Sequence, residues 1–187
     1  MMRNIVIVSG NNDLGNSIIN LLSQNDNIIV ISNTADAHKQ INEQFPGVVY
    51  CTCDITKPNE IEVIINLIIE KYGNIDILIN NFESWPESDI VDATYEELAN
   101  RIDVNTKGPL YVTKIVLEKM YAQGNGLVIN ANADNSLEKY DYHIISGSGK
   151  FIFDNKETDV KAGDSITIEA NKSFTYKGKM IIIVEML

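Results

Sequence analysis

The chain has 187 residues, 44% of them hydrophobic, which is enough to bury the core of one domain or of two small ones. Its net charge is −11: residues 1–137 carry 8 basic against 18 acidic side chains, and residues 138–187 carry 7 against 8. This acidity disfavours nucleic acids and anionic membranes as partners, and no run approaches the ~20 uncharged apolar residues of a membrane helix.

The start of the chain and its cysteines indicate a cytoplasmic protein. Residues 1–5 pass directly into a strand-like run, without the apolar segment and cleavage site of a secretory signal. Cys51 and Cys53 are separated by one residue, so on a strand both thiols face the same side. We expect two reduced thiols. The alternative is a C-x-C metal pair, for which only His38 and His143 are available, and neither is close in sequence.

Strand-like and helical segments alternate along residues 4–130. Short apolar runs predict strands, and the stretches between them have helical spacing or helix-capping signals. Because the strand-like runs are apolar throughout, the pattern predicts a parallel sheet covered by helices on both faces. The expected strands are residues 4–9, 28–32, 48–53, 75–79 and 126–130, and the expected helices are residues 14–24, 35–44, 58–72 and 94–120.

Two of these helices carry specific signals. Pro58 falls in the first turn of its helix, where the missing N–H is tolerated. Thr94-Tyr95-Glu96-Glu97 has the form of a capping box and predicts the start of the long helix. Gly108-Pro109 predicts a local irregularity within that helix.

After residue 133 the alternation ends and short β-strand patterns follow. Turn-rich sequences separate them, including Ser146-Gly147-Ser148-Gly149 and Lys177-Gly178. We therefore expect an α/β domain over residues 1–135 and a small antiparallel β unit over residues 138–187. A unit of this size is marginal alone and should pack on the first part or on a second copy of itself. The expected strands are residues 142–145, 150–153, 165–169, 173–176 and 180–185.

A glycine-rich turn follows the first expected strand. Gly10, Asn12 and Gly15 occupy the three positions of a G-x-G-x-x-G motif, which brings backbone N–H groups close to a pyrophosphate at a helix N-terminus. Asparagine tolerates left-handed backbone angles, but the Asn12 side chain would crowd the phosphates. Asp13 adds a negative charge at the same place. The motif therefore supports the fold more strongly than it supports retained dinucleotide binding.

Five segments in order resemble the short-chain dehydrogenase/reductase family over residues 3–133. The resemblance implies a Rossmann-type doubly wound sheet and NAD or NADP as the cofactor. The five segments are residues 9–15 (the glycine-rich opening), 53–56 (whose Asp contacts adenine), 77–83 (Asn-Asn-Ala-Gly in the family), 103–108 (with the catalytic asparagine) and 126–133 (ending in the catalytic serine). The cofactor-binding positions that the resemblance implies are Ser9, Gly10, Asn12, Gly15, Asn33, Asp54, Ile55 and Asn81.

The positions that perform hydride transfer in this family are only partly matched. The family's serine falls on Ala133, and the register of its tyrosine and lysine then falls on Ser146 and Lys150. The asparagine matches at Asn105. An aliphatic hydroxyl cannot replace a phenol of pKa ~10 as the proton donor. Sequence around Lys150 is typical of a strand rather than of the family's helix, so this match can arise by chance.

The expected cofactor cleft also departs from the family. Phe82 and Glu83 replace Ala and Gly and add bulk and negative charge beside the cofactor. Asn33 stands where the family places Asp for NAD or Arg for NADP, so the preference between the two stays open. We expect dinucleotide binding to be weak or lost.

Residues 138–187 resemble a truncated cupin domain. Residues 142–151 and 162–168 follow that family's course of strand, Ser-Gly-x-Gly, strand, Gly-Asp and strand. A cupin metal needs a cluster of imidazoles and a carboxylate, but the glutamate position falls on Tyr140 and a histidine position falls on Phe174. We therefore expect no metal. The aromatic side chains are expected to form the core of this unit, or alternatively to line an apolar ligand slot.

The sequence leaves the present function open, including whether the chain is an enzyme. The favoured hypothesis is a non-catalytic protein that binds a small-molecule ligand or a protein partner, as a homodimer that protects its β edges. The alternative is an NAD(P)-dependent oxidoreductase with an atypical proton donor such as Tyr140 or Tyr142. A third hypothesis is a decayed gene product with little function.

Overall fold

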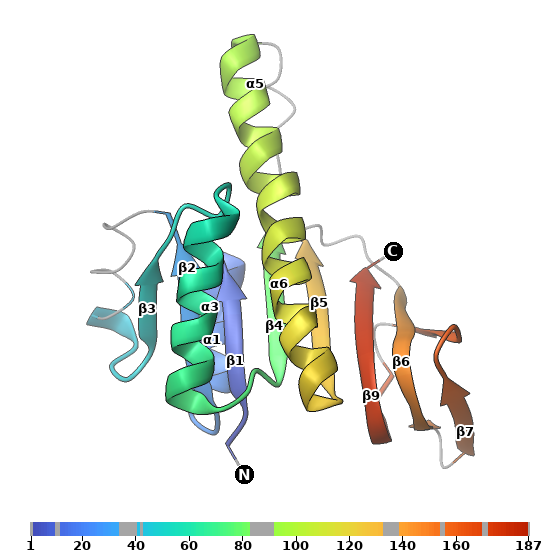
Figure 1. Ribbon diagram of the computed structural model, residues 1–187. Coiled ribbons are helices and arrows are strands. Elements are labelled where there is room, and N and C mark those ends of the chain that lie inside the picture. Colours follow the sequence, from blue (N-terminus) through green and yellow to red (C-terminus); the bar gives the residue numbers. More distant parts are fainter. Residues whose placement is uncertain are drawn as a thin grey trace.

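The computed structural model describes residues 2–9, 12–33, 41, 43–82, 92–132, 139–153, 156–169 and 172–186. Within them, nine strands form one sheet (Figure 1). The strands are β1 (Asn4–Val8), β2 (Asn27–Ser32), β3 (Val49–Thr52), β4 (Ile77–Phe82), β5 (Gly126–Asn132), β6 (Lys139–Phe153), β7 (Lys156–Lys161), β8 (Ser165–Glu169) and β9 (Phe174–Met186). The helices are α1 (Asp13–Leu22), α3 (Pro58–Tyr72), α5 (Tyr95–Ile102), the π-helix η1 (Asp103–Lys107) and α6 (Gly108–Gln123).

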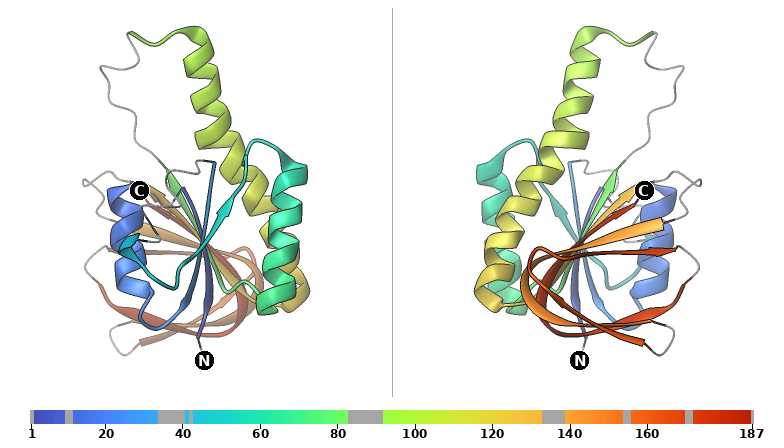
Figure 2. Two further views of the ribbon diagram at one scale, coloured as in Figure 1. Left: turned by 90° about the vertical axis from the view of Figure 1, so that its left-hand side faces the viewer. Right: turned by 90° about the vertical axis from the view of Figure 1, so that its right-hand side faces the viewer.

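The first five strands form a parallel sheet, which confirms the Rossmann-type prediction. β1 pairs with β2 and β4, β2 also pairs with β3, and β4 also pairs with β5, all in parallel. Every residue of β1 is buried, because α1 covers one face of the sheet and α3 and α6 cover the other (Figure 2). The helix expected at residues 35–44 lies mostly outside the described residues. None of the described helices is long and apolar enough to cross a membrane.

β9 adds a sixth parallel strand to this sheet. Ile181 pairs with Gly126 at the start of β5, and Val184 pairs with Ile129. Alternate side chains of β9 reach opposite faces, so Ile181 joins the core beneath α3 and α6, whereas Ile182 joins a separate core formed by the later strands. The later strands therefore continue the parallel sheet directly, and the strand order is β3-β2-β1-β4-β5-β9-β6-β7, with β8 paired to β6.

Strands β6 to β9 curl over the same face of the sheet as α1 (Figure 2). β6 pairs antiparallel with β7, β8 and β9, as the sequence predicts. The curl brings Tyr142, near the start of β6, against Phe151 near its end, with ring centroids 5.7 Å apart. Leu127 and Ile129 of β5 pack both on the α1 side and in the core of the curled strands. The antiparallel pairing alone does not identify a cupin, so that resemblance stays a prediction.

The strand breaks expected at residues 146–149 and 177–178 are wrong. These residues lie inside β6 and β9, because their glycines allow close approach and bending instead of a turn. Gly149 lies opposite Gly178, and a Cβ added at Gly178 would lie 2.6 Å from the Cα of Gly149. The register also shifts between Ile144 and Ser146, which marks a β-bulge.

β7 is a strand that the sequence did not predict. Only Val160 among its six residues is buried. Its charged side chains give no alternation of apolar and polar residues, which is the usual signal of a half-buried strand. Charged residues on a strand at the sheet edge oppose pairing with another chain.

The long helix is interrupted where Gly108-Pro109 predicts an irregularity. α5, η1 and α6 run end to end (Figure 1), and the capping box between Thr94 and Glu97 is present. Pro109 has no N–H to donate, and its ring displaces the carbonyl one turn earlier, so the preceding turn widens into a π-helix. Gly108 then lies against Ile55, since a Cβ there would be 2.7 Å from the Ile55 side chain.

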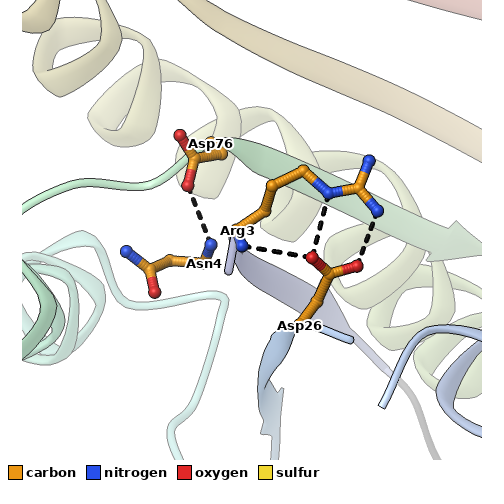
Figure 3. Close-up of polar contacts among 4 residues, drawn as sticks. All are labelled: Arg3, Asn4, Asp26 and Asp76. Carbon is orange, nitrogen blue, oxygen red and sulfur yellow. Dashed lines mark hydrogen bonds and ion pairs between the residues drawn. The ribbon is translucent and has the colours of Figure 1, made fainter. Parts of the chain in front are cut away.

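Polar contacts fix the N-terminal edge of the sheet (Figure 3). The guanidinium of Arg3 contacts both carboxylate oxygens of Asp26, with Nη2 to Oδ2 at 2.6 Å and Nε to Oδ1 at 3.0 Å. The backbone N–H of Asn4 donates to Asp76 Oδ2 at 2.8 Å. These contacts tie β1 to the residues that precede β2 and β4. Arg3 holds the pKa of the buried Asp26 carboxyl below its usual value.

We predict that Asp26→Asn lowers the free energy of unfolding at pH 7 by about 1–2 kcal/mol, allowing for solvent screening of the half-exposed Arg3. The folded-state pKa of Asp26 is lowered, so the unfolded state binds more protons and the contribution is fully present above the unfolded pKa of ~3.9. It is lost as the pH falls through the folded-state pKa. Urea unfolding of both proteins at pH 7 and pH 3 should show the difference shrinking at pH 3, and an unchanged difference would contradict the assignment.

Candidate functional site at the carboxyl edge of the parallel sheet

The residues expected to bind a cofactor gather at one edge of the sheet. Ser9 follows β1, Asn33 follows β2 and Asp54 follows β3. Asn81 is the penultimate residue of β4. The carboxyl ends of parallel strands meet at this edge, where open α/β sheets bind ligands. Ser9 has a left-handed backbone with φ of +58°, and its N–H donates to Ile31 O at 2.9 Å.

Asn12 links the first helix to the sheet. It is the N-cap of α1, and its Oδ1 accepts hydrogen bonds from Gly15 N–H at 2.8 Å and from Asn81 Nδ2 at 2.7 Å. The second hydrogen of Asn81 Nδ2 goes to Ser9 O, also at 2.7 Å. The structure thus brings four of the sequence-predicted cofactor residues into one hydrogen-bonded cluster: Ser9, Asn12, Gly15 and Asn81.

Asp54 is engaged within its own turn. Its Oδ1 accepts from Thr56 N–H at 3.0 Å and from Thr56 Oγ1 at 2.7 Å, and Lys57 Nζ lies 3.1 Å from its Oδ2. The hydrogen bonds from Thr56 and the charge of Lys57 lower the pKa of this carboxyl. Ile55 is buried against Gly108 of α6, and Asn33 is exposed. These three predicted positions share the edge but are not part of the Asn12 cluster.

Some predicted positions lie outside the described residues. They are Gly10, Glu83 and Ala133, together with the side chain of Phe82.

A second polar cluster at this edge was not predicted. Asn80 Nδ2 donates to Thr113 Oγ1 of α6 at 2.8 Å and to Asn130 Oδ1 of β5 at 2.9 Å. The signal in the sequence is an asparagine at the end of two neighbouring apolar strands, and Asn80 and Asn130 are direct partners in the ladder. The sequence alone does not show that β4 and β5 are neighbours, so it does not predict this cluster.

The two matched catalytic positions lie at opposite edges of the sheet. Asn105 belongs to η1, just before Gly108, which packs on Ile55 at the carboxyl edge. Lys150 pairs with Lys177 of β9, which precedes Ile181 on that strand. Ile181 pairs with Gly126, the first residue of β5, so Lys150 lies at the amino edge of the sheet. The Nζ of Lys150 contacts Glu157 Oε2 at 2.6 Å, and this carboxylate raises the pKa of Lys150. The structure therefore does not bring Lys150 to Asn105.

The tyrosines and the histidine of β6 occupy different surroundings. The Tyr142 ring packs edge-on against Phe151 and Phe174, and burial raises the pKa of its phenol. Tyr140 pairs with Met186 at the carboxyl edge. His143 Nδ1 lies 2.8 Å from Ser165 Oγ. In the described part of the chain, no group of three or more His, Cys, Asp and Glu side chains could hold a metal ion, and the absence of a bound metal stays a prediction.

A family model described as "short chain dehydrogenase" matches residues 3–154. The chain belongs to this family. Among curated relatives, an uncharacterized oxidoreductase from Staphylococcus saprophyticus is 33% identical over 129 residues, covering 67% of this chain and 52% of the relative. Carbonyl reductase family member 4 from Xenopus tropicalis is 25% identical, covering 70% and 56%. The chain thus spans about half the length of the curated relatives it matches.

Solved structures of short-chain dehydrogenases share the fold. A short-chain type dehydrogenase/reductase from Mycobacterium marinum superimposes with a TM-score of 0.61 at 19% identity, covering 68% of this chain and 54% of that one. A variant of ElxO with NADPH bound gives a TM-score of 0.60 at 23% identity, covering 70% and 55%. At these identities the likeness shows the fold alone.

The cofactor implied by the family does not fit the described N-terminus of α1 as it stands. A diphosphate at a helix N-terminus accepts hydrogen bonds from backbone N–H groups of the first turn. In this chain, the N–H of Gly15 already donates to Asn12 Oδ1, and the Asp13 carboxylate belongs to the same turn. A diphosphate that used the N–H of Gly15 would have to displace the Asn12 side chain, and it would approach a like charge.

Proposed function

We propose that this chain is a non-catalytic member of the short-chain dehydrogenase family, which binds a small ligand or a protein partner at the carboxyl edge of its sheet. One observation carries the proposal: Lys150 lies at the opposite edge of the sheet from Asn105 and is ion-paired with Glu157. A lysine in that position cannot assist proton transfer at the carboxyl edge, because a general acid or base must be within hydrogen-bond reach of its proton. The free thiols Cys51 and Cys53 support a cytoplasmic location.

The positions expected to donate a proton support the same proposal. Ser146 stands in the register of the family's tyrosine, and it lies in β6 opposite Ile181. Its aliphatic hydroxyl is a far weaker acid than a phenol. Tyr142 has its ring among aromatic side chains, and its raised pKa makes it a poorer donor than an exposed tyrosine.

A second candidate function is an NAD(P)-dependent oxidoreductase that uses an atypical donor. The observation that favours it is the position of Tyr140 at the carboxyl edge, opposite Met186. In this reaction the tyrosine would donate its proton to a carbonyl oxygen as hydride arrives from the nicotinamide.

We predict that the purified chain oxidises neither NADH nor NADPH above background with a panel of aldehydes and ketones, followed at the nicotinamide absorbance. Tyr140→Phe removes the phenol of the alternative donor and serves as the matched variant, with Tyr142→Phe as its control. Turnover that Tyr140→Phe lowers by about 10²-fold or more, while Tyr142→Phe leaves it unchanged, would establish the oxidoreductase instead.

We propose that the homodimer forms along one face of the α5–η1–α6 helix, and not at the β edges that the sequence favours, because the exposed residues of β7 oppose edge pairing. This helix extends beyond the sheet at its α5 end (Figure 1). Four large apolar side chains on this helix are exposed. An α-helix repeats its face about every seven residues. The wider turn of η1 takes up one extra residue, so positions eight apart across it also align. The resulting apolar stripe consists of Tyr95 (92% exposed), Ile102 (50%), Leu110 (63%) and Tyr121 (53%).

The charges on this helix favour a second copy in antiparallel orientation. The half before residue 104 carries Glu96, Glu97 and Asp103 against one arginine. The half after it carries Lys107, Lys114 and Lys119 against one glutamate. An antiparallel two-fold arrangement places the acidic half of each helix against the basic half of the other, and it buries both stripes.

We predict that the chain elutes with twice the mass of one chain in size-exclusion chromatography with light scattering, and that the double variant Ile102→Glu, Leu110→Glu elutes as a monomer. Buried charges without partners in the centre of the stripe would weaken association by several kcal/mol. Leu21→Glu on α1 is the matched control, because Leu21 is 75% exposed and away from this helix. A dimer that persists in the double variant would assign the interface elsewhere.

A further inference from the structure

A hollow lies between the carboxyl end of β3 and the first two turns of α3. Its volume is about 390 Å³, which is within the range of sites that hold small molecules. β3 is the outermost strand on its side of the sheet. None of the residues that line the hollow belongs to the Asn12 cluster or to the cofactor positions implied by the family. The lining residues are Thr52, Cys53, Asn59, Glu60, Val63 and Ile64.

Most of this lining is apolar. Ile64 packs against the core beneath α3 and α6, whereas Val63 is 58% exposed. Leu67 follows one turn later on the same face of α3 and is 54% exposed, so it extends the apolar surface beyond the hollow. Burial, followed by the charges of nearby carboxylates, raises the pKa of Cys53 to about 11, so this thiol stays protonated and contributes a neutral surface. The hollow can therefore hold the apolar body of a small molecule.

One carboxylate in the lining is held in place by its neighbours. Glu60 Oε2 accepts the backbone N–H of Asp54 at 3.2 Å, and Lys57 Nζ lies 3.2 Å from Glu60 Oε1. The same Lys57 Nζ lies 3.1 Å from Asp54 Oδ2. Two carboxylates against one ammonium leave this network with a net negative charge, and the carboxylate oxygens of Glu60 keep lone pairs that can accept further hydrogen bonds. The net charge of −11 also favours the approach of a cation.

We propose that the hollow between β3 and α3 binds a small cationic amphiphile, which is a molecule with an apolar ring system and one protonated amine. The ring system packs on Val63 and Ile64, and the ammonium group donates to the carboxylate of Glu60. An anion with the same ring system meets the like charges of Glu60 and Asp54 instead. The inference rests on the proposed function, which places a small ligand at the carboxyl edge, and it deepens that function by naming the class of ligand.

Isothermal titration of the full chain with three indole compounds tests this inference. Tryptamine carries a protonated amine, tryptophol a hydroxyl and indole-3-propionate a carboxylate on nearly the same apolar body. The unaltered chain should bind tryptamine at least about tenfold more tightly than indole-3-propionate, with tryptophol between them. Glu60→Gln keeps the size of the side chain and removes its charge, so it should reduce this preference to less than about threefold. Val63→Lys places an ammonium beside the hollow and should lower tryptamine affinity at least about tenfold. Because Val63 is exposed, this variant serves if Glu60→Gln disturbs the turn at Asp54.

Glu62→Gln is the matched control, because it removes the same charge from the other flank of α3, where Glu62 lines a groove with Tyr111 and Lys114 of α6. It should leave the preference for tryptamine unchanged. An equal loss from Glu62→Gln and Glu60→Gln would assign the preference to the net charge of the chain and overturn the site. Equal affinity for the three compounds, or no measurable binding of tryptamine at millimolar concentration, would also overturn the inference. None of the three compounds contains a nicotinamide, so failure of the proposed non-catalytic function would be visible separately in the nicotinamide assay.

Discussion

Replacing Phe151 with alanine is expected to lower the free energy of unfolding by about 3–5 kcal/mol. Phe151 is 2% exposed, and its ring lies in the centre of the core formed by the curled strands. It stacks on Phe174 with centroids 5.5 Å apart and receives the edge of Tyr142 at 5.7 Å. Alanine leaves a cavity that the surrounding sheet cannot close, because β6 is paired on both sides at this point. A loss of this size is a large share of a domain's total stability.

The measurement is urea unfolding followed by circular dichroism, with Phe174→Ala as the matched control. Phe174 belongs to the same aromatic cluster but is only partly buried, so its replacement removes less buried surface and is expected to cost about 1–3 kcal/mol. If both variants lose the same free energy, Phe151 is not the centre of this core. If neither loses more than about 1 kcal/mol, the curled strands contribute little to folding.

The parallel half of the fold could be predicted because its signals are local. Each strand is a short, continuously apolar run, and each helix has its own capping or spacing signal. The later strands are harder to predict, because their glycines resemble strand breaks. A glycine within a strand pattern can mark a turn or a close approach of two strands, and only the pairing of Gly149 with Gly178 decides between them. The joining of β9 to β5 in parallel is also a long-range event without a local signal.

Some residues of the candidate site could likewise be predicted from the sequence, and others could not. Ser9, Asn12 and Asn81 could be placed together because the ends of parallel strands necessarily meet at one edge. Counting residues from Ala133 places the family's lysine at Lys150 only if this stretch forms the family's helix. The chain instead forms β6 there, and a strand rises about 3.3 Å per residue against about 1.5 Å in a helix. The same number of residues therefore carries Lys150 to the far edge.

The crossing of β6 and β9 at Gly178 is expected to be as sensitive as the aromatic core. Gly178 has φ of +128°, which L side chains rarely adopt, and an added Cβ would lie 2.6 Å from both Gly149 Cα and Ser148 O. These are backbone atoms of the neighbouring strand and cannot move aside as a side chain would. We expect Gly178→Ala to lower the free energy of unfolding by about 3–5 kcal/mol, combining backbone strain with overpacking.

Gly163→Ala separates these two causes. Gly163 also has a positive φ, +94°, but a Cβ there meets no atom within 4 Å, so only the backbone strain of about 1–3 kcal/mol applies. Equal losses in the two variants would show that close approach of the strands is not a constraint. A larger loss for Gly178→Ala would show that it is, and the effect should reach the parallel sheet. β9 is the strand that joins β5, so any separation of β6 from β9 also exposes Leu127 and Ile129, which pack against the core of the curled strands.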